Sequence, residues 1–331
     1  RSTPKHVLPL GESGRPLLRE TYERASRLAS EVFVLTETGQ RAIIQQVLPE
    51  LDSAHLILEP AARGTTNAYG LAALTLRETH PDSVMLVLPA DHVVGGRAGA
   101  AKAVRAAVHA AATSDSLVTV GLKPRFPSTG LGYIHAPGRM TGGALRVKRF
   151  TEKPDPATAR RFIKAGGYYW NLAWFSWRLD VFIDELGRYA PRHLAGLREV
   201  MAARAAGNEA AAAATYKRLR VDVIDRSVME RTDRLLLVPG DFEWADIGNW
   251  AELGDRVRAD VRGNSVEGES ILVDTTGSLI LGSRRLVAAI GLDDMIIVDT
   301  EDAILVCPRS RAQDVRKVVD ALRRAGKTRY L

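Results

Sequence analysis

Apolar and polar positions follow two different periods along the first 260 residues. Unbroken apolar runs, such as those within residues 83–94 and 117–122, are typical of strands buried on both faces. Stretches with helical spacing, such as residues 17–29 and 68–79, lie between such runs. Strands that alternate with helices indicate parallel βαβ units. The pattern therefore predicts an α/β fold with a mostly parallel sheet.

From Asn264 the pattern changes to short apolar segments separated by turns. Short strands at near-regular spacing indicate a separate β-rich module, for which a left-handed β-helix-like solenoid of few turns is one candidate form. Residues 312–324 have the spacing of a closing helix. We therefore expect a large domain over residues 1–260 and a small one over residues 261–331.

Composition narrows the class of protein. The chain has 331 residues, of which 46% are hydrophobic and 26% charged, which is ordinary for a soluble globular protein. No apolar run is long enough to span a bilayer and no signal peptide is visible at Arg1, so we expect a cytoplasmic protein without a membrane partner. The single cysteine, Cys307, excludes an internal disulfide framework.

The net charge of +7 is compatible with nucleic acid, a membrane surface or a polyanionic small substrate. However, no block of lysine and arginine is interleaved with aromatic residues, so we expect no nucleic-acid partner. Many arginines fall instead on helical stretches such as residues 98–112 and 202–220, where they form solvated faces.

Three polar residues stand out from their surroundings. Asp91 follows the apolar run that Pro89 ends, and ligands of open α/β sheets lie beyond the carboxyl ends of the strands. This stretch alone leaves open whether Asp91 binds a metal or is a turn acid. Asn171 lies among aromatic residues, where an amide is costly unless it is hydrogen-bonded. Asp225 is predicted to cap a helix that begins near Val223.

Eight short motifs occur in one order along the chain. They are Pro4-Lys5, EPAARGT at 59–65, LPADH at 88–92, TGLGYI at 129–134, FTEKP at 150–154, YWN at 169–171, IDRSVME at 224–230 and WADIGNW at 244–250. Together they resemble bacterial mannose-1-phosphate guanylyltransferases, also called GDP-mannose pyrophosphorylases, within the sugar-1-phosphate nucleotidyltransferases. The resemblance covers nearly the whole chain. It implies a Rossmann-like sheet with helices on both faces.

The resemblance also implies a reaction in which mannose 1-phosphate attacks the α-phosphate of GTP, giving GDP-mannose and pyrophosphate. Such a transfer requires positioning and charge neutralisation more than a protein nucleophile, so no covalent intermediate is expected. The implied cofactor is Mg²⁺ or another divalent cation. The apolar strands of the small module suggest a homodimer.

The resemblance assigns Asp91 and Asp246 to the metal. Two neighbouring carboxylates repel each other unless a cation lies between them, and the alternative for Asp246 alone is a turn acid. Lys5 corresponds to the lysine that the family places on the nucleotide phosphates, although a lysine met in isolation is more often a solvated surface residue. These three residues are the predicted catalytic set.

On the nucleotide side, the resemblance adds Glu59, Arg63, Thr65 and Pro89 to Lys5 and Asp91. A carboxylate can accept both adjacent donors on the Watson–Crick edge of guanine, so Glu59 is the candidate for base selection. The alternative is that Glu59 caps the helix that starts near Asn67. The sequence RGTTNAY also differs from the family's usual RNTAPA.

On the sugar side, Lys153 corresponds to the sugar-phosphate lysine, and a compact ammonium suits a mobile phosphate. Glu152 and Asn171 resemble the residues that hold the mannose hydroxyls. The motif at 129–134 supplies Gly130, Gly132 and Tyr133, and its glycines allow close approach of the main chain to the sugar ring. The sequence WNLAWF departs from the small residues usual after WN, which changes the expected sugar pocket.

Two rival functions keep the same fold. One is a nucleotidyltransferase for another nucleotide and sugar 1-phosphate, and the other is a non-catalytic, GDP-mannose-binding regulatory paralogue. The family also opens with a strand and a glycine-rich loop of the kind GGxGxRLWPLS, upstream of the position of Lys5. We therefore expect roughly ten to twenty further residues ahead of Arg1, which would supply one central strand and its loop.

Overall fold

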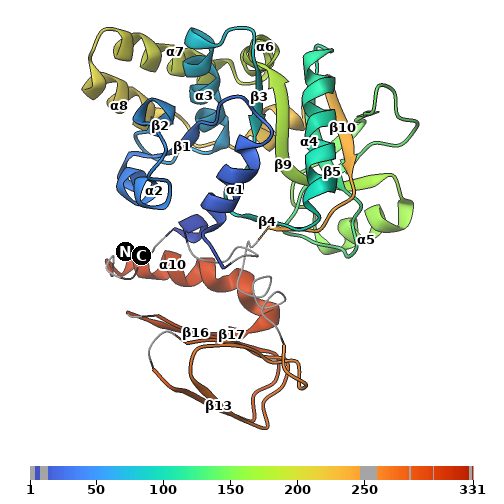
Figure 1. Ribbon diagram of the computed structural model, residues 1–331, viewed down its shortest axis with the longest axis vertical. Coiled ribbons are helices and arrows are strands. Elements are labelled where there is room, and N and C mark those ends of the chain that lie inside the picture. Colours follow the sequence, from blue (N-terminus) through green and yellow to red (C-terminus); the bar gives the residue numbers. More distant parts are fainter. Residues whose placement is uncertain are drawn as a thin grey trace. The chain divides into compact units, whose positions relative to one another are not determined.

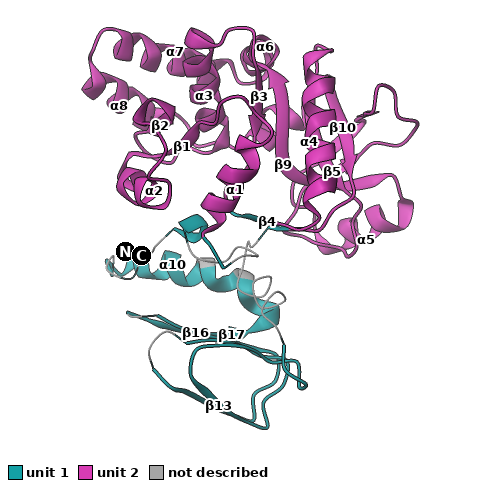
Figure 2. Ribbon diagram, in the orientation of Figure 1, with its two compact units in different colours: residues 1–15, 91–93, 245–331 teal, residues 16–90, 94–244 magenta. Residues whose placement is uncertain are grey.

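The computed structural model describes residues 4–7, 14–246, 259–282, 285–300, 302–327 and 330. The chain divides into two compact units (Figure 2). The first contains residues 1–15, 91–93 and 245–331, and the second contains residues 16–90 and 94–244. The predicted domain boundary at residue 260 stays a prediction. No described helix has both the length and the apolar character that crossing a membrane requires.

The second unit contains most of the helices. They are α1 (Leu17–Ser26), α2 (Arg41–Val47), α3 (Thr65–Thr79), α4 (Arg97–Ala112), α5 (Pro156–Ala165), α6 (Leu179–Tyr189), α7 (Pro191–Ala205) and α8 (Glu209–Arg218). Its strands outside the main sheet are β1 (Val34–Glu37) and β2 (Leu56–Glu59), which pair in parallel.

The main sheet of the second unit has seven strands, and five of them run in the order β7-β10-β5-β9-β6, with β8 next to β6 and β3 paired to β9. The strands are β3 (Val84–Val87), β5 (Leu117–Leu122), β6 (Tyr133–His135), β7 (Leu145–Arg146), β8 (Arg149–Thr151), β9 (Tyr168–Arg178) and β10 (Leu235–Gly240). All six residues of β5 are buried, as its apolar run predicts. β5 and β10 are parallel, whereas the long β9 is antiparallel to its neighbours.

Two apolar clusters cover the two faces of this sheet. The first includes α3, α6 and α7, for example through Leu71, Phe182 and Leu197. The second includes α4, which lies over β5, β9 and β10 (Figure 1), and buries Val104 and Trp174. Because helices cover both faces, the prediction of an α/β sheet between two helical layers is confirmed.

The C-terminal part of the first unit is β-rich, as predicted. Its strands are β12 (Ser265–Glu267), β13 (Ser270–Val273), β14 (Leu279–Leu281), β15 (Val287–Ile290), β16 (Met295–Asp299) and β17 (Ile304–Pro308), followed by α10 (Val315–Arg324). β12, β14 and β16 are parallel neighbours, β17 is antiparallel to β16, and β13 pairs in parallel with β15. Buried polar side chains form hydrogen bonds with the backbone of the turns. The Asn264 side-chain amide, for example, donates to the Thr275 carbonyl at 2.8 Å.

Candidate functional site

Lys5, Asp91 and Asp246 meet within the first unit. Lys5 lies in a short 3₁₀ helix (Lys5–Val7), and Asp91 immediately precedes β4 (His92–Val94). Asp246 ends β11 (Trp244–Asp246), which pairs with β4. The Lys5 Nζ atom lies 3.2 Å from Asp91 Oδ2 and 3.3 Å from Asp246 Oδ1. One ammonium therefore bridges two carboxylates that come from separate strand ends.

The charge state of Asp91 reflects opposing influences. Burial raises the pKa of the Asp91 carboxyl. The neighbouring His92 and Lys5 together lower this pKa by more than burial raises it, so the net pKa lies below the ordinary value. His92 is buried, with Nε2 3.9 Å from Asp91 Oδ1. The lowered pKa keeps Asp91 ionised at neutral pH, as a metal ligand or a phosphate-site acid must be.

The donor set of Asp91, His92 and Asp246 fits a small cation. Ligand atoms of these three residues lie within 4.8 Å of one another. Two carboxylates against one ammonium leave a net charge of about −1 before His92 is counted, which favours a further cation. Carboxylate oxygens are the preferred protein ligands of Mg²⁺, whereas an imidazole is a better ligand for zinc, copper, iron or nickel. The structure thus brings the predicted catalytic residues together, and it adds His92 to the donor set.

A second group of predicted residues gathers in the second unit around Asn171. Its side chain is almost fully buried: the Oδ1 atom accepts from Thr119 Oγ1 at 3.1 Å, and the Nδ2 atom donates to Asp225 Oδ1 at 3.0 Å. The Asn171 backbone N–H donates to the Gly132 carbonyl at 2.9 Å. The amide is therefore hydrogen-bonded, as its aromatic surroundings required.

Glu152 lies beside Gly132. A Cβ atom at Gly132 would lie only 2.8 Å from Glu152 Oε2, so a larger residue here would displace the carboxylate from its present position. The Lys153 Nζ atom is 3.3 Å from Glu152 Oε1, and Lys153 adopts a left-handed φ of 46°. Strained non-glycine backbone of this kind is often found at ligand sites. The Glu152 and Lys153 heads thus form an ion pair at the end of β8.

Two other residues of the TGLGYI motif have packing and turn contacts. The Tyr133 ring is fully buried next to Phe162, and its hydroxyl donates to the Phe126 carbonyl. Burial raises the pKa of the Tyr133 hydroxyl. The Gly130 N–H donates to Ser128 Oγ at 3.2 Å. The structure therefore places the Tyr133 side chain in the core.

Glu59 ends β2, where it has partners within the protein. The Tyr216 hydroxyl donates to Glu59 Oε2 at 2.7 Å. Burial raises the pKa of Glu59, and the hydrogen bonds from Tyr216 and from the Arg63 backbone oppose that effect. Burial and Glu59 together hold the pKa of Tyr216 well above its ordinary value. Glu59 does not cap α3, because the N-cap residue of that helix is Gly64.

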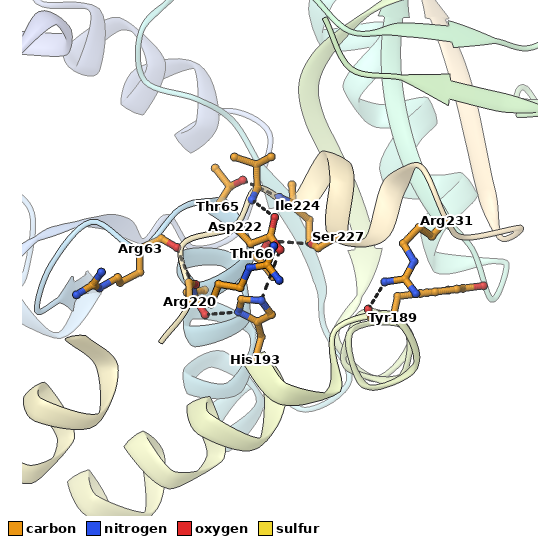
Figure 3. Close-up of polar contacts among 12 residues, drawn as sticks. Arg63, Thr65, Thr66, Tyr189, His193, Arg220, Asp222, Ile224, Ser227 and Arg231 are labelled. Atoms are coloured by element: carbon orange, nitrogen blue, oxygen red, sulfur yellow. Dashed lines mark hydrogen bonds and ion pairs between the residues drawn. The ribbon is translucent and has the colours of Figure 1, made fainter. Parts of the chain in front are cut away.

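Arg63 and Thr65 form the turn that follows Glu59, and this turn contacts the chain segment 220–227 (Figure 3). The Thr65 hydroxyl accepts from the Ile224 N–H at 2.9 Å, and the Arg63 carbonyl accepts from the Asp222 N–H at 3.3 Å. Gly64, with φ of 79°, lies tightly against the Asp222 backbone. Pro89, the remaining predicted nucleotide residue, lines an apolar cavity.

The segment 222–230 joins the two predicted groups of the second unit. Thr65 and Thr66 contact it through Ile224 and Ser227, while Asn171 and the Glu152 N–H contact it through Asp225 and Glu230. The segment contains a π-helix (Asp225–Met229) with Ile224 at its N-cap, so the prediction of Asp225 as the helix cap is wrong. The Asp225 carboxylate instead faces Asn171.

Sequence reasoning missed Asp225 and Tyr216 as parts of these groups. Burial, and then the charge of Glu152, raise the pKa of Asp225 to about 7. Asp225 could have been noticed within the motif IDRSVME, whereas no local signal marks Tyr216 in its alanine-rich helix. Four residues of WADIGNW, at positions 247–250, lie outside the described residues.

Two family models match the chain. Residues 1–262 match the family model described as nucleotidyl transferase. The chain belongs to the nucleotidyl transferase family. Residues 268–322 match the model of a mannose-phosphate isomerase/GMP-like β-helix domain. The β-rich C-terminal module thus has its counterpart in a β-helix domain of known type.

Named relatives cover almost the entire chain. The chain is 37% identical to the xanthan biosynthesis protein XanB of Xanthomonas campestris pv. campestris, over 99% of this chain and 70% of that protein. It is 34% identical to a mannose-1-phosphate guanylyltransferase of Escherichia coli, over 99% of this chain and 71% of that protein. A crystal structure from Thermus thermophilus, described as a mannose-1-phosphate geranyltransferase, is 32% identical with a TM-score of 0.84, over 97% of this chain and 92% of that one.

Proposed function

We propose that the protein transfers GMP from GTP to mannose 1-phosphate, giving GDP-mannose and pyrophosphate. The similarity to the mannose-1-phosphate guanylyltransferase of Escherichia coli over 99% of the chain is the observation that carries this proposal. The bridge of Lys5 between Asp91 and Asp246 supports the type of chemistry, because phosphate transfer depends on positioned charges.

The reaction is an in-line displacement at the α-phosphate of GTP. A phosphate oxygen of mannose 1-phosphate forms the new bond to that phosphorus atom. The bond from the same phosphorus to the bridging oxygen breaks, and its electron pair leaves with pyrophosphate. Lys5, Asp91 and Asp246 are the cluster of charged groups that we assign to this step.

Lys5 is the residue that we assign to the nucleotide phosphates. Its ammonium donates hydrogen bonds to the carboxylates of Asp91 and Asp246. A bound triphosphate would compete with these carboxylates for the ammonium, because it carries more negative charge. Asp91 and Asp246 would then hold a divalent cation, for which Mg²⁺ fits the carboxylate oxygens. Such an ion supplies neutralisation of phosphate charge. The two acids would hold this ion beside Lys5.

Glu152 and Asn171 are proposed to orient mannose 1-phosphate. Asn171 is held by Thr119 and Asp225, so its amide has one fixed orientation. Lys153 projects a half-exposed ammonium beside Glu152, a position suited to a sugar phosphate. Glu59 is proposed to select guanine. Its carboxylate is already fixed by Tyr216, and a fixed acceptor costs less entropy on binding.

A homodimer is proposed from one surface of the β-rich module. The outer residues of β13 and β15 are apolar and exposed: Ile271 is 56%, Val273 44% and Ile290 72% exposed. They lie side by side in the parallel pair, since Ile271 pairs with Ala288 and Val273 with Ile290. A contiguous apolar face of this kind is typical of an interface.

A nucleotide panel tests the proposed reaction. The protein is mixed with Mg²⁺, mannose 1-phosphate and one of GTP, ATP, UTP or dTTP, and released pyrophosphate is measured. We expect turnover with GTP to exceed turnover with the other nucleotides. A preference for UTP or dTTP with glucose 1-phosphate would support the rival nucleotidyltransferase. Binding of GDP-mannose without any turnover would support the regulatory paralogue.

The variant Asp246→Asn tests the assignment of the strand-end acids in the same assay. We expect kcat to fall by at least about 100-fold, because a fixed charge at the phosphate site is lost. Asp241→Asn is the matched control, since Asp241 is an exposed acid five positions earlier, and it should keep full activity. Full activity of Asp246→Asn with Mg²⁺ would remove Asp246 from the site.

A further inference from the structure

Asn67 is a fully buried residue in the first turn of α3. Its Nδ2 atom donates to the Arg63 carbonyl at 2.7 Å and to the Arg220 carbonyl at 2.8 Å, and its Oδ1 atom lies 3.0 Å from His193 Nδ1. Carbonyl oxygens only accept hydrogen bonds, so the two carbonyls fix the orientation of the amide. One side chain therefore links the start of α3 to the turn before it, to the segment 220–227 and to α7.

His193 holds the amide from the other side. It lies in the first turn of α7 and is buried. Because Asn67 Oδ1 can only accept, the proton of the imidazole is on Nδ1 and is donated to Asn67. Burial lowers the pKa of His193, while the carboxylate of Asp222, 3.7 Å from Nε2, opposes this effect. The hydrogen bond between the ring and the amide thus gives each of them one orientation.

The Asn67 amide acts on the Arg63 main chain, which has hydrogen bonds on both sides. The Arg63 carbonyl accepts from Asn67 and, at 3.3 Å, from the Asp222 N–H. The Arg63 N–H donates to the Glu59 carboxylate and lowers its pKa. A chain of hydrogen bonds therefore connects His193 on α7 with Glu59 at the end of β2.

Residues 60–64 form an irregular turn between β2 and α3, so their backbone groups need partners outside regular structure. A Cβ atom at Gly64 would lie 2.1 Å from the Asp222 carbonyl oxygen, so the turn packs directly against the segment 220–227 (Figure 3). The Asn67 amide contacts both stretches, through Arg63 and Arg220. Proline, which the usual sequence RNTAPA has at the position of Asn67, has no side-chain donor for these contacts.

We propose that Asn67 and His193 are positioning residues for nucleotide selection, because they hold the Arg63 peptide that fixes the Glu59 carboxylate. This inference rests on the proposed role of Glu59 in selecting guanine. A fixed carboxylate can accept both guanine donors at once, whereas a carboxylate that rotates loses entropy on binding. The Arg63 N–H is a main-chain donor, so it fixes the carboxylate relative to the turn even where the Tyr216 hydroxyl is absent.

His193→Leu and His193→Asn test this proposal as a matched pair. Both variants lose the imidazole ring, but an asparagine amide can still donate from the position of Nδ1, whereas leucine cannot. We expect His193→Leu to lower the ratio of kcat/KM for GTP over ATP by about fivefold or more, because Glu59 is misplaced. His193→Asn should keep the ratio of the unmodified protein. An unchanged ratio in folded His193→Leu, with a lowered ratio in Glu59→Gln, would overturn the proposal.

Amide hydrogen exchange followed by NMR tests the positioning itself, in the protein without nucleotide. We expect the Arg63 and Asp222 amides to exchange about tenfold faster or more in His193→Leu, because the turn is released, and at the original rate in His193→Asn. The amide of Ile134 in β6 lies in the same unit, outside this network, and should keep its rate in both variants. Equal acceleration at Ile134 and in the turn would show that His193 only stabilises the fold, and would overturn the proposal.

The two measurements separate this proposal from the proposed function. If Glu59→Gln leaves the GTP/ATP ratio unchanged, base selection by Glu59 fails, and the exchange of the Arg63 amide alone decides whether His193 positions the turn. Faster exchange limited to the turn would then support the positioning, and unchanged exchange would overturn it. If His193→Leu does not fold, Asn67→Ser gives the same test, since a serine hydroxyl is too short to keep all three contacts of the amide.

Discussion

Glu59 has hydrogen-bond partners within the protein. Tyr216 donates to its carboxylate, and the raised pKa of Glu59 shows that burial outweighs this stabilisation. The carboxylate could therefore serve in base selection, in holding the turn at Arg63, or in both. A substitution that separates these roles must change its acceptor pattern while keeping its shape.

Glu59→Gln is such a change. An amide keeps one acceptor oxygen and replaces the other by a donor, so it loses one of the two hydrogen bonds that guanine N1–H and N2–H₂ would make. We expect the ratio of kcat/KM for GTP over ATP to fall by about tenfold, which corresponds to the loss of one hydrogen bond to a charged group. Steady-state kinetics with the two nucleotides measures this ratio.

Tyr216→Phe is the matched control for Glu59. It removes the hydroxyl that holds the carboxylate but keeps the carboxylate itself. We expect a loss of about 1 kcal/mol of stability with little change in the GTP/ATP ratio. If Glu59→Gln and Tyr216→Phe both lower stability and neither alters the ratio, Glu59 holds the turn and does not read the base.

Some contacts between individual residues can be predicted from the sequence. Lys5, Asp91 and Asp246 were proposed as a set from their motifs, and the structure brings their side chains together. Tyr216 could not be found in this way. Its contact with Glu59 spans 157 positions, and its hydroxyl lies in a helix whose local pattern indicates only packing.

At the scale of elements, β9 shows what the hydrophobic pattern cannot predict. The apolar run at residues 168–177 indicates a buried element, and the structure contains the strand Tyr168–Arg178. Between Asn171 and Phe175, however, the register against β5 shifts, and Ala173 has a left-handed φ of 53°. A bulge of this kind re-aims side chains. No glycine marks this bulge in the sequence, and within it the Ala173 N–H donates to Asn171 Oδ1 at 3.1 Å.

The segment 222–230 contains an acid, Asp225, whose pKa is raised by its burial. Its Asp225 accepts a hydrogen bond from Asn171 and lies in the electrostatic field of Glu152. The folded pKa of about 7 lies above the ordinary value of 3.8, so the folded protein binds this proton more tightly than the unfolded chain does. Stability is therefore greatest at low pH for this group, and it falls as the pH rises from about 4 to about 7.

Asp225→Asn should remove this dependence. The amide oxygen can still accept from Asn171, while the charge that burial disfavours is absent. We expect the variant to gain about 1 to 3 kcal/mol relative to the unmodified protein at pH 8, and to show no such gain at pH 4. Chemical denaturation at both pH values measures the difference. An equal effect at the two pH values would mean that Asp225 does not titrate in this range.

At the scale of the whole molecule, the sequence predicts the type of structure in each unit, but it does not predict which residues belong to each unit. The change of pattern at Asn264 indicated a β-rich module, and the structure has strands from Ser265 onward. Its compact unit also contains residues 1–15 and 91–93, which lie far from the module in sequence. Hydrophobic periodicity reports local structure, so it cannot assign a short distant segment to a unit.

The proposed homodimer belongs to this scale. Two copies could place the exposed faces of β13 and β15 against each other, since a two-fold contact uses the same patch on both subunits. This patch contains Ile271, Val273, Ala288 and Ile290, which are all exposed and uncharged. Water released from these four side chains would supply the favourable free energy of association.

Ile290→Glu tests this contact at a residue that is 72% exposed. A carboxylate there would face its own copy or apolar residues across the two-fold axis, and a buried unpaired charge is strongly unfavourable. We expect sedimentation velocity to show a dimer for the unmodified protein and a monomer for Ile290→Glu. Val318→Glu is the control, because Val318 is 50% exposed on α10 and lies on neither β13 nor β15. Dissociation by Val318→Glu with a persistent Ile290→Glu dimer would move the interface to the helix.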